Sequence, residues 1–214
     1  MRGQLLFYRV VRDTLVAFDR VFWRLTVEGK EHAPEGPFIL APVHRSNVDT
    51  PLVCAVTKRR LRYMGKETVW KYRIPGWILT ALGGFPVRRG AADREALRRC
   101  VAVLEGGEPL VLFPEGTRQS GPKIQPLYEG AAYLSLRTGV PIVPVGVGGS
   151  ERAMPKGSKL LHPVKVHLIV GEPIYPPPPG EGRRTSRRAV QELTDHLAQE
   201  LQRLFDDARA KVGD

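Results

Sequence analysis

The chain has 214 residues, which is enough for one domain with a full hydrophobic core and short for two. Hydrophobic residues make up 42% and charged residues 26%, a composition that argues against intrinsic disorder. Lys and Arg total 33 against 22 acidic residues, and the formal net charge of +11 favours nucleic acid, anionic lipid headgroups or phosphorylated substrates as partners. A basic surface that only aids solubility is the alternative.

In chain order, the first predicted element is a helix over residues 4–25. At about 100° per residue, apolar side chains gather on one side and arginines on the other. The apolar side consists of Phe7, Val10, Val11, Leu15, Phe18, Val21, Phe22 and Leu25, and the opposite side of Arg2, Arg9, Arg20 and Arg24 with Asp13. Such a helix can lie in a membrane interface with its arginines among anionic headgroups. The alternative is a surface helix that packs its apolar stripe on the core.

The rest of the chain alternates between short apolar runs and helical patterns. The predicted strands cover residues 38–43, 61–64, 84–87, 110–113, 142–147 and 165–170, and the predicted helices residues 48–57, 70–82, 93–105 and 130–138. This alternation predicts an α/β fold with a mostly parallel central sheet flanked by helices. After the proline run at 176–179, a terminal helix begins near Thr185 or Ser186. We expect an amphipathic, membrane-associating helix over residues 1–28 and one α/β domain over residues 29–214.

Two cysteines and the N-terminal composition bear on the compartment. Cys54 lies in an apolar run and Cys100 in a helical pattern, which predicts buried, reduced thiols rather than a disulfide. No Cys/His cluster has the spacing of a zinc site. No stretch approaches the roughly 20 apolar residues that span a bilayer, and arginines interrupt any signal-peptide pattern. We therefore expect a cytoplasmic protein that can still lie on a membrane.

The first segment with catalytic potential runs from His44 to Asp49. His44 follows a predicted strand and Asp49 opens the next helix, and sites in α/β sheets form at the carboxyl ends of strands. A carboxylate that binds one imidazole nitrogen leaves the other nitrogen free to remove a proton from a hydroxyl. The alternative is a loop histidine followed by an aspartate that only complements the helix dipole.

Three further segments also follow or form predicted strands. Residues 113–118 close a strand, and backbone N–H groups at Gly116 with the Thr117 hydroxyl and the Arg118 guanidinium would suit a phosphate. An ordinary polar turn is the alternative there. Residues 83–89 end in two arginines that add positive charge near the same sheet edge. Residues 140–145 form an apolar strand bracketed by prolines, which suggests shape more than chemistry.

In this order and spacing, the four segments resemble the four motif blocks of the PlsC-type glycerolipid acyltransferases, which include 1-acylglycerol-3-phosphate (lysophosphatidate) acyltransferases. The resemblance covers about residues 32–150 and also includes residues 66–77 and 126–132. The combination of the 44–49 and 113–118 blocks makes it specific, since neither block alone would be. Two positions depart from the pattern: Arg88 stands where the family often has Asp, and Tyr128 where it often has Lys.

The resemblance implies an enzyme and assigns roles to residues. His44 would be the general base and Asp49 the carboxylate that orients it. The acceptor phosphate would be bound, and the site shaped, by Arg88, Arg89, Glu115, Gly116, Thr117 and Arg118. The acyl donor would be a thioester on coenzyme A or acyl carrier protein, with no metal or other cofactor. The acceptor would be lysophosphatidate and the product phosphatidate, made at the cytoplasmic face of the cell membrane by a peripheral or monotopic protein.

Several alternatives remain open from the sequence. Glycerol-3-phosphate, another lysophospholipid or a glycolipid could replace lysophosphatidate as the acceptor. A nucleic-acid-binding module would explain the charge, but the chain has no RNP, KH, zinc or helix-turn-helix signature, so we expect no nucleic acid partner. A catalytically inactive scaffold conflicts with the presence of both His44 and Asp49.

Overall fold

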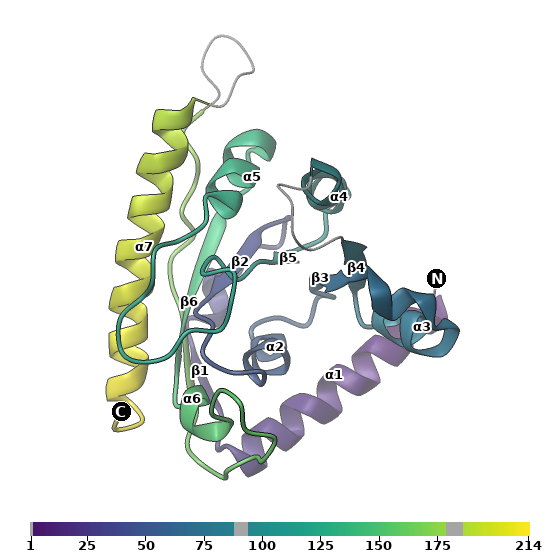
Figure 1. The fold of residues 1–214 in the computed structure, drawn as a ribbon, viewed down its shortest axis with the longest axis vertical. Coiled ribbons are helices and arrows are strands. Elements are labelled where there is room, and N and C mark those ends of the chain that lie inside the picture. Colours follow the sequence, from purple (N-terminus) through teal and green to yellow (C-terminus); the bar gives the residue numbers. More distant parts are fainter. Residues whose placement is uncertain (1, 88–93, 179–185) are drawn as a thin grey trace.

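The computed structural model describes residues 2–87, 94–178 and 186–214. A seven-stranded sheet forms the centre of the fold, in the order β1-β7-β6-β2-β5-β3-β4, with helices on both faces (Figure 1). The strands are β1 (Thr26–Glu28), β2 (Ile39–Pro42), β3 (Arg62–Lys66), β4 (Gly84–Val87), β5 (Leu110–Val111), β6 (Ile142–Gly148) and β7 (His167–Val170). Every neighbouring pair is parallel except β6 and β7, so the predicted α/β fold with a mostly parallel sheet is confirmed.

The helices lie near their predicted positions. They are α1 (Arg2–Phe22), α2 (Asp49–Leu52), α3 (Arg73–Ala81), α4 (Arg94–Glu105), α5 (Gly130–Thr138), α6 (Ser150–Ala153) and α7 (Arg187–Ala210), with 3-10 turns at Lys30–His32, Val53–Ala55 and Glu67–Lys71. Ser186 is the N-cap of α7, since its side chain accepts a hydrogen bond from the backbone N–H of Ala189. Both cysteines are buried free thiols, as expected.

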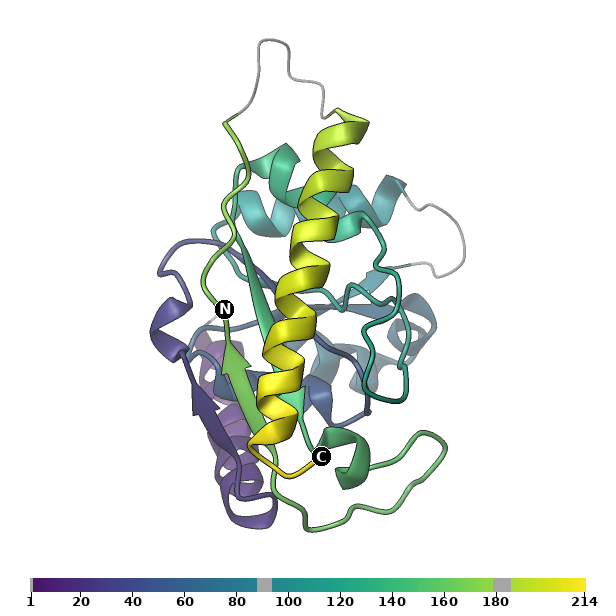
Figure 2. The ribbon, with the colours of Figure 1, turned by 90° about the vertical axis from the view of Figure 1, so that its left-hand side faces the viewer.

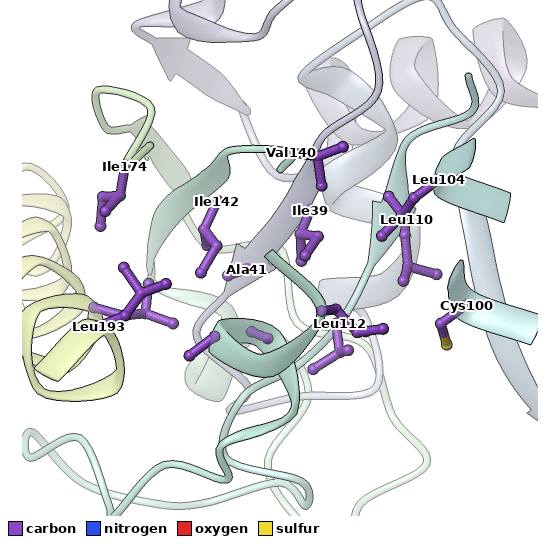
Figure 3. Packing of buried hydrophobic residues seen from close by; sticks show 14 of the residues in the cluster. Ile39, Ala41, Cys100, Leu104, Leu110, Leu112, Val140, Ile142, Ile174 and Leu193 are labelled. Carbon is purple, nitrogen blue, oxygen red and sulfur yellow. The ribbon is translucent and has the colours of Figure 1, made fainter. Parts of the chain in front are cut away.

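Alternating side chains of β2 build two separate hydrophobic cores. Ile39 and Ala41 point to the face covered by α4, α5 and α7, whereas Leu40, with Phe38 just before the strand, points to the face covered by α1 and α2. Figure 3 shows the first of these cores, in which Leu193 of α7 and Leu104 of α4 lie at the two ends of a row of strand side chains. Burial on both faces explains why the central strands read as continuous apolar runs in the sequence.

Helix α7 lies lengthwise against β6, which Figure 2 shows from the side of the helix. Two glycines of β6 allow this close approach. A Cβ atom at Gly146 would lie 2.2 Å from the carbonyl oxygen of Leu204, and one at Gly148 would lie 2.2 Å from that of Ala208. Any larger residue at either position would therefore push α7 away from the sheet.

The N-terminal segment differs from its prediction in two ways. The helix ends at Phe22 rather than Leu25, because the backbone N–H groups of Trp23 and Leu25 both bond to the Asp19 carbonyl and the chain turns. Trp23 and Leu25 then enter the core, and residues 26–28 form β1 in the sheet. Residues 1–28 are thus not helical throughout. No helix in the described ranges is long and apolar enough to cross a membrane.

The face of α1 that packs on the domain overlaps the predicted apolar side only in part. Tyr8, Val16 and Asp19 are buried there, and the Tyr8 hydroxyl donates to the carbonyl of Arg59. On the predicted apolar side, Val10 is 58% exposed and Val21 is 82% exposed. The alternative in which this stripe docks on the core is therefore wrong for the outer part of the stripe.

Candidate active site

The His44–Asp49 segment and the 113–118 segment meet at one edge of the sheet. Strands β2 and β5 are parallel neighbours, with Leu40 opposite Val111, so their carboxyl ends lie side by side. His44 follows β2 and Phe113 follows β5. Their rings stack with centroids 4.0 Å apart, which places the His44 loop directly against the 113–118 turn.

His44 and Asp49 form the predicted pair. The His44 Nδ1 lies 3.0 Å from Asp49 Oδ2, the Asp49 side chain is fully buried, and that of His44 is 16% exposed. A carboxylate oxygen only accepts hydrogen bonds, so Nδ1 carries the proton and Nε2 is left as an acceptor. This is the arrangement that a general base requires.

Backbone donors hold the Asp49 carboxylate in place. The N–H groups of Arg45 and Ser46 both donate to Asp49 Oδ2, each at 2.7 Å. These two bonds direct the oxygen that binds His44, so Asp49 orders the loop as well as the imidazole. Asp49 Oδ1 is also buried and has no hydrogen-bond partner among the described residues.

A buried ion pair joins the two motif loops. The Arg45 guanidinium donates to both oxygens of Glu115 at 2.7 and 2.8 Å, and both residues are almost fully buried. Glu115 also accepts from the backbone N–H of His44 at 3.1 Å and from that of Gln125 at 3.2 Å. Further Arg45 N–H groups bond to the carbonyls of Gly121 and Lys123.

Arg45 was missed as a site residue in the sequence. A signal was present, since an arginine stands between His44 and Asp49, three residues after a strand with no exposed residue. The resemblance implies that its partner Glu115 helps to bind the phosphate, but both Glu115 oxygens accept hydrogen bonds from protein donors. Glu115 therefore shapes the site and holds the His44 loop, and its carboxylate is not free for a ligand.

The 113–118 turn differs in part from the phosphate site expected there. Gly116 is exposed, with φ of 70°, and a Cβ atom there would lie 2.5 Å from the Tyr128 ring. The backbone N–H of Gly116 donates to the Phe113 carbonyl, and that of Thr117 donates to the Glu115 carbonyl. The expectation that these amides are free for a phosphate is therefore wrong, because the turn itself uses them.

Side chains of the turn remain available to a ligand. Thr117 is exposed, and its hydroxyl oxygen accepts a hydrogen bond from the Gln119 side chain. Arg118 is half-buried, and within the described ranges its guanidinium has no hydrogen-bond or ion-pair partner. Arg88 and Arg89 lie outside the described residues. They directly follow β4, whose carboxyl end lies at the same edge of the sheet as those of β2 and β5.

Known proteins share this fold and these segments. The structure is similar to the crystal structure of the 1-acyl-sn-glycerophosphate acyltransferase PlsC from Thermotoga maritima, with a TM-score of 0.74 and 27% identity over 97% of this chain and 88% of that one. The chain is 28% identical to a chloroplastic 1-acyl-sn-glycerol-3-phosphate acyltransferase of Brassica napus, over 72% of this chain and 46% of that protein. It is 29% identical to a 1-acyl-sn-glycerol-3-phosphate acyltransferase of Bacillus subtilis, over 70% of this chain and 73% of that protein.

The plant and algal relatives are longer proteins, and this chain spans about half of their length. A further relative, 28% identical over 58% of this chain, is the lyso-ornithine lipid O-acyltransferase of Pseudomonas aeruginosa. The family described as Acyltransferase matches residues 24–148, which include the His44–Asp49 pair, the Arg45–Glu115 ion pair and the 113–118 turn. Since this match covers more than half of the chain, the resemblance noted in the sequence is confirmed, and the protein belongs to the acyltransferase family.

Proposed function

We propose that the protein transfers a fatty acyl chain from a thioester donor to the free hydroxyl of lysophosphatidate, which makes phosphatidate. One observation carries the proposal: the loop after β2 presents a partly exposed His44, with Nδ1 held by the buried Asp49 and with Nε2 unpaired among the described residues. The similarity to 1-acyl-sn-glycerol-3-phosphate acyltransferases of Brassica napus and Bacillus subtilis supports lysophosphatidate as the acceptor. The thioester donor, on coenzyme A or acyl carrier protein, follows from the resemblance.

The chemistry needs one base and one positioned acceptor. His44 Nε2 removes the proton of the acceptor hydroxyl as its oxygen attacks the thioester carbonyl carbon. The tetrahedral intermediate then collapses, the carbon–sulfur bond breaks, and the thiolate leaves and takes up the proton from the imidazolium. Since the substrate supplies the nucleophile, no acyl-enzyme and no cofactor are required. Among the described residues of the 113–118 turn, Arg118 has an unpaired guanidinium that can bind the acceptor phosphate. We propose that Arg88 and Arg89 assist it.

A second acceptor class has a specific observation in its favour. The Tyr128 side chain, which is 68% exposed, lies against Gly116 in the proposed phosphate-binding turn. A neutral ring stands here where the family often has a lysine, so a headgroup with less negative charge than lysophosphatidate could be accommodated. Another lysophospholipid or a glycolipid is therefore the alternative acceptor, and the lyso-ornithine relative is an example of such a specificity. Glycerol-3-phosphate, which has no acyl chain, is a further alternative acceptor.

We also propose that the protein works at the cytoplasmic face of the membrane through α1. On the predicted apolar side of this helix, Val10, Phe18 and Val21 are exposed, and Leu5 and Leu6 add exposed apolar side chains near its start. Arg9 and Arg20 are exposed on the adjoining side, where they can meet anionic headgroups. The helix thus carries three strips: one packed on the domain, one apolar and one basic.

An acceptor screen tests the proposed reaction. Purified protein would be given acyl-coenzyme A or acyl carrier protein thioester with lysophosphatidate, glycerol-3-phosphate or lyso-ornithine lipid, and the products identified by mass spectrometry. We expect phosphatidate from lysophosphatidate, and no product from a His44→Ala variant. Acylation of lyso-ornithine lipid alone would favour the second acceptor class. Acyl transfer by His44→Ala at the wild-type rate would contradict the mechanism.

A further inference from the structure

The loop between α6 and β7, residues 154–166, exposes two adjacent leucines. Leu160 is 70% exposed and Leu161 is 43% exposed, and neither belongs to either hydrophobic core. Lys156 and Lys159 are exposed in the same loop, and within the described part of the chain neither has a hydrogen-bond or ion-pair partner. The α6–β7 loop therefore combines apolar bulk with free positive charge.

Hydrogen bonds hold this loop in one conformation. The N–H of Ser158 donates to the Pro155 carbonyl at 2.9 Å, and the N–H of Leu160 donates to the Ser158 hydroxyl oxygen at 3.0 Å. The N–H of His162 donates to the Ala153 carbonyl at 2.8 Å and closes the loop at its base. The leucines are therefore presented to the outside by an ordered turn.

The loop lies between the catalytic loop and the end of α1. At its start, the Met154 carbonyl accepts a hydrogen bond from the Ser46 hydroxyl at 2.8 Å. At its far side, the His162 carbonyl accepts from Trp23 Nε1 at 2.9 Å. Figure 1 shows this loop beside α6, near the end of α1 that is distant from the N-terminus. The two ends of the loop are therefore tied to the catalytic loop and to the turn that follows α1.

We propose that the α6–β7 loop is a second membrane-contact element, with the surface of an anionic bilayer as its partner. Its two leucines enter the acyl boundary while Lys156 and Lys159 meet the headgroups, as in interfacial segments generally. A single helix on a membrane can still roll about its axis, whereas a second contact beside its end prevents this. The loop thereby keeps the His44 edge of the sheet at the lipid surface. This inference rests on the membrane association under Proposed function.

A fluorescent probe tests the contact directly. Leu160→Cys would be labelled with an environment-sensitive fluorophore and mixed with vesicles of phosphatidylcholine and phosphatidylglycerol. The native thiols should not react, because both are buried and burial raises the pKa of Cys100 to about 12 and that of Cys54 above its usual value. The matched control is Tyr175→Cys: this residue is 66% exposed and lies beside Ile174, which pairs with the first residue of β6, at the opposite edge of the sheet.

We expect a blue shift of the probe at position 160 on addition of vesicles and none at position 175. Leu160→Asp with Leu161→Asp should weaken vesicle binding about tenfold or more while the melting temperature stays near that of the wild type, since both side chains are exposed. Lys156→Gln with Lys159→Gln should reduce the preference for anionic vesicles. The matched control, Arg98→Gln with Arg187→Gln, removes the same amount of charge from α4 and α7. It should reduce the preference for anionic vesicles much less.

Two results would overturn the inference: a probe at position 160 that does not respond to vesicles, or a leucine variant that binds vesicles like the wild type. A leucine variant that loses only self-association would show that the loop contacts a second copy of the chain instead. None of these measurements depends on turnover. If the acceptor screen finds no acyl transfer while the probe responds, the proposed reaction fails and the membrane contact stands.

Discussion

The Arg45 guanidinium lies 2.7 and 2.8 Å from the two carboxylate oxygens of Glu115, at a site where both side chains are almost fully buried. The two residues are 70 positions apart in the chain, and each lies within one of the two motif segments that form the site. Because Glu115 also accepts from the backbone N–H of His44, this ion pair fixes the catalytic loop against the 113–118 turn.

The Arg45–Glu115 pair should show strong coupling in stability. Arg45→Met or Glu115→Leu alone leaves a buried charge without its partner, which costs about 3–5 kcal/mol in comparable proteins. The double variant removes both charges and should be less destabilised than the sum of the single losses. Urea unfolding of all four proteins measures this. Losses that simply add would show that the two charges are independent of each other.

His44 and Asp49 should act as one catalytic unit. Removal of the base by His44→Ala should lower kcat by about 10² to 10⁴. Asp49→Ala should also lower it, because the carboxylate works through the imidazole, and the double variant should be little slower than His44→Ala. Asp49→Ala should in addition lower the melting temperature, since the N–H groups of Arg45 and Ser46 lose their acceptor. Rate losses that multiply in the double variant would contradict the pairing.

Arg118 should contribute to acceptor binding and much less to donor binding. Arg118→Ala removes a charge-assisted hydrogen bond worth about 1.5–3 kcal/mol, so acceptor KM should rise by roughly one to two orders of magnitude. Steady-state kinetics with each substrate varied in turn measures the effect. Arg118→Lys keeps the charge and should recover part of the loss. An unaltered acceptor KM in Arg118→Ala would exclude Arg118 from the phosphate site.

Asp19 should make the stability depend on pH in an unusual direction. Burial raises the pKa of this carboxyl from 3.8 to about 6, and its Oδ2 has no hydrogen-bond partner in the described part of the chain. The folded state therefore binds the proton more tightly than the unfolded state does. The resulting stabilisation is full below about pH 4 and is lost as the pH rises through about 6.

Asp19→Asn should remove that dependence. At pH 7 the variant should be more stable than the wild type by about 2 kcal/mol, and the difference should vanish near pH 4. Urea unfolding midpoints across pH 4–8 measure how the stability of the wild type and of Asp19→Asn depends on pH. Asp13→Asn, on the exposed side of the same helix, is the matched control and should change little. A wild-type midpoint that rises between pH 4 and 6 relative to Asp19→Asn would contradict the assignment.

The outer side of α1 should bind vesicles without contributing to the core. Val10→Asp with Val21→Asp should release the protein from anionic vesicles and leave the melting temperature near that of the wild type, because both side chains are mostly exposed. Vesicle co-sedimentation measures the release. High salt should weaken wild-type binding without abolishing it, since only the arginine contribution is screened. Phe22→Asp is the contrasting variant: its ring contacts the buried Trp23, so it should lower stability.

Much of this protein could be predicted from the sequence alone. The apolar runs around Ile39, Leu110 and Ile142 must be buried on both faces, which already predicts central strands of a parallel sheet. The positions of His44 and of the 113–118 turn directly after two such runs predict a site at one sheet edge. The pairing of His44 with Asp49 follows from their spacing of five residues, because local geometry is set by a strand end and the next helix start.

Only the tertiary structure decided the features that depend on contacts between distant segments. No local sequence pattern predicts the Arg45–Glu115 ion pair, the antiparallel direction of β7 against β6 or the short strand β1. Each of them is stabilised by residues far away in the chain. The same holds for α1: its sequence shows one apolar and one basic side, but packing on the domain uses a third side that contains Tyr8 and Asp19. A helical pattern reports which side chains share a face, whereas the shape and polarity of the neighbouring surface decide which face is buried.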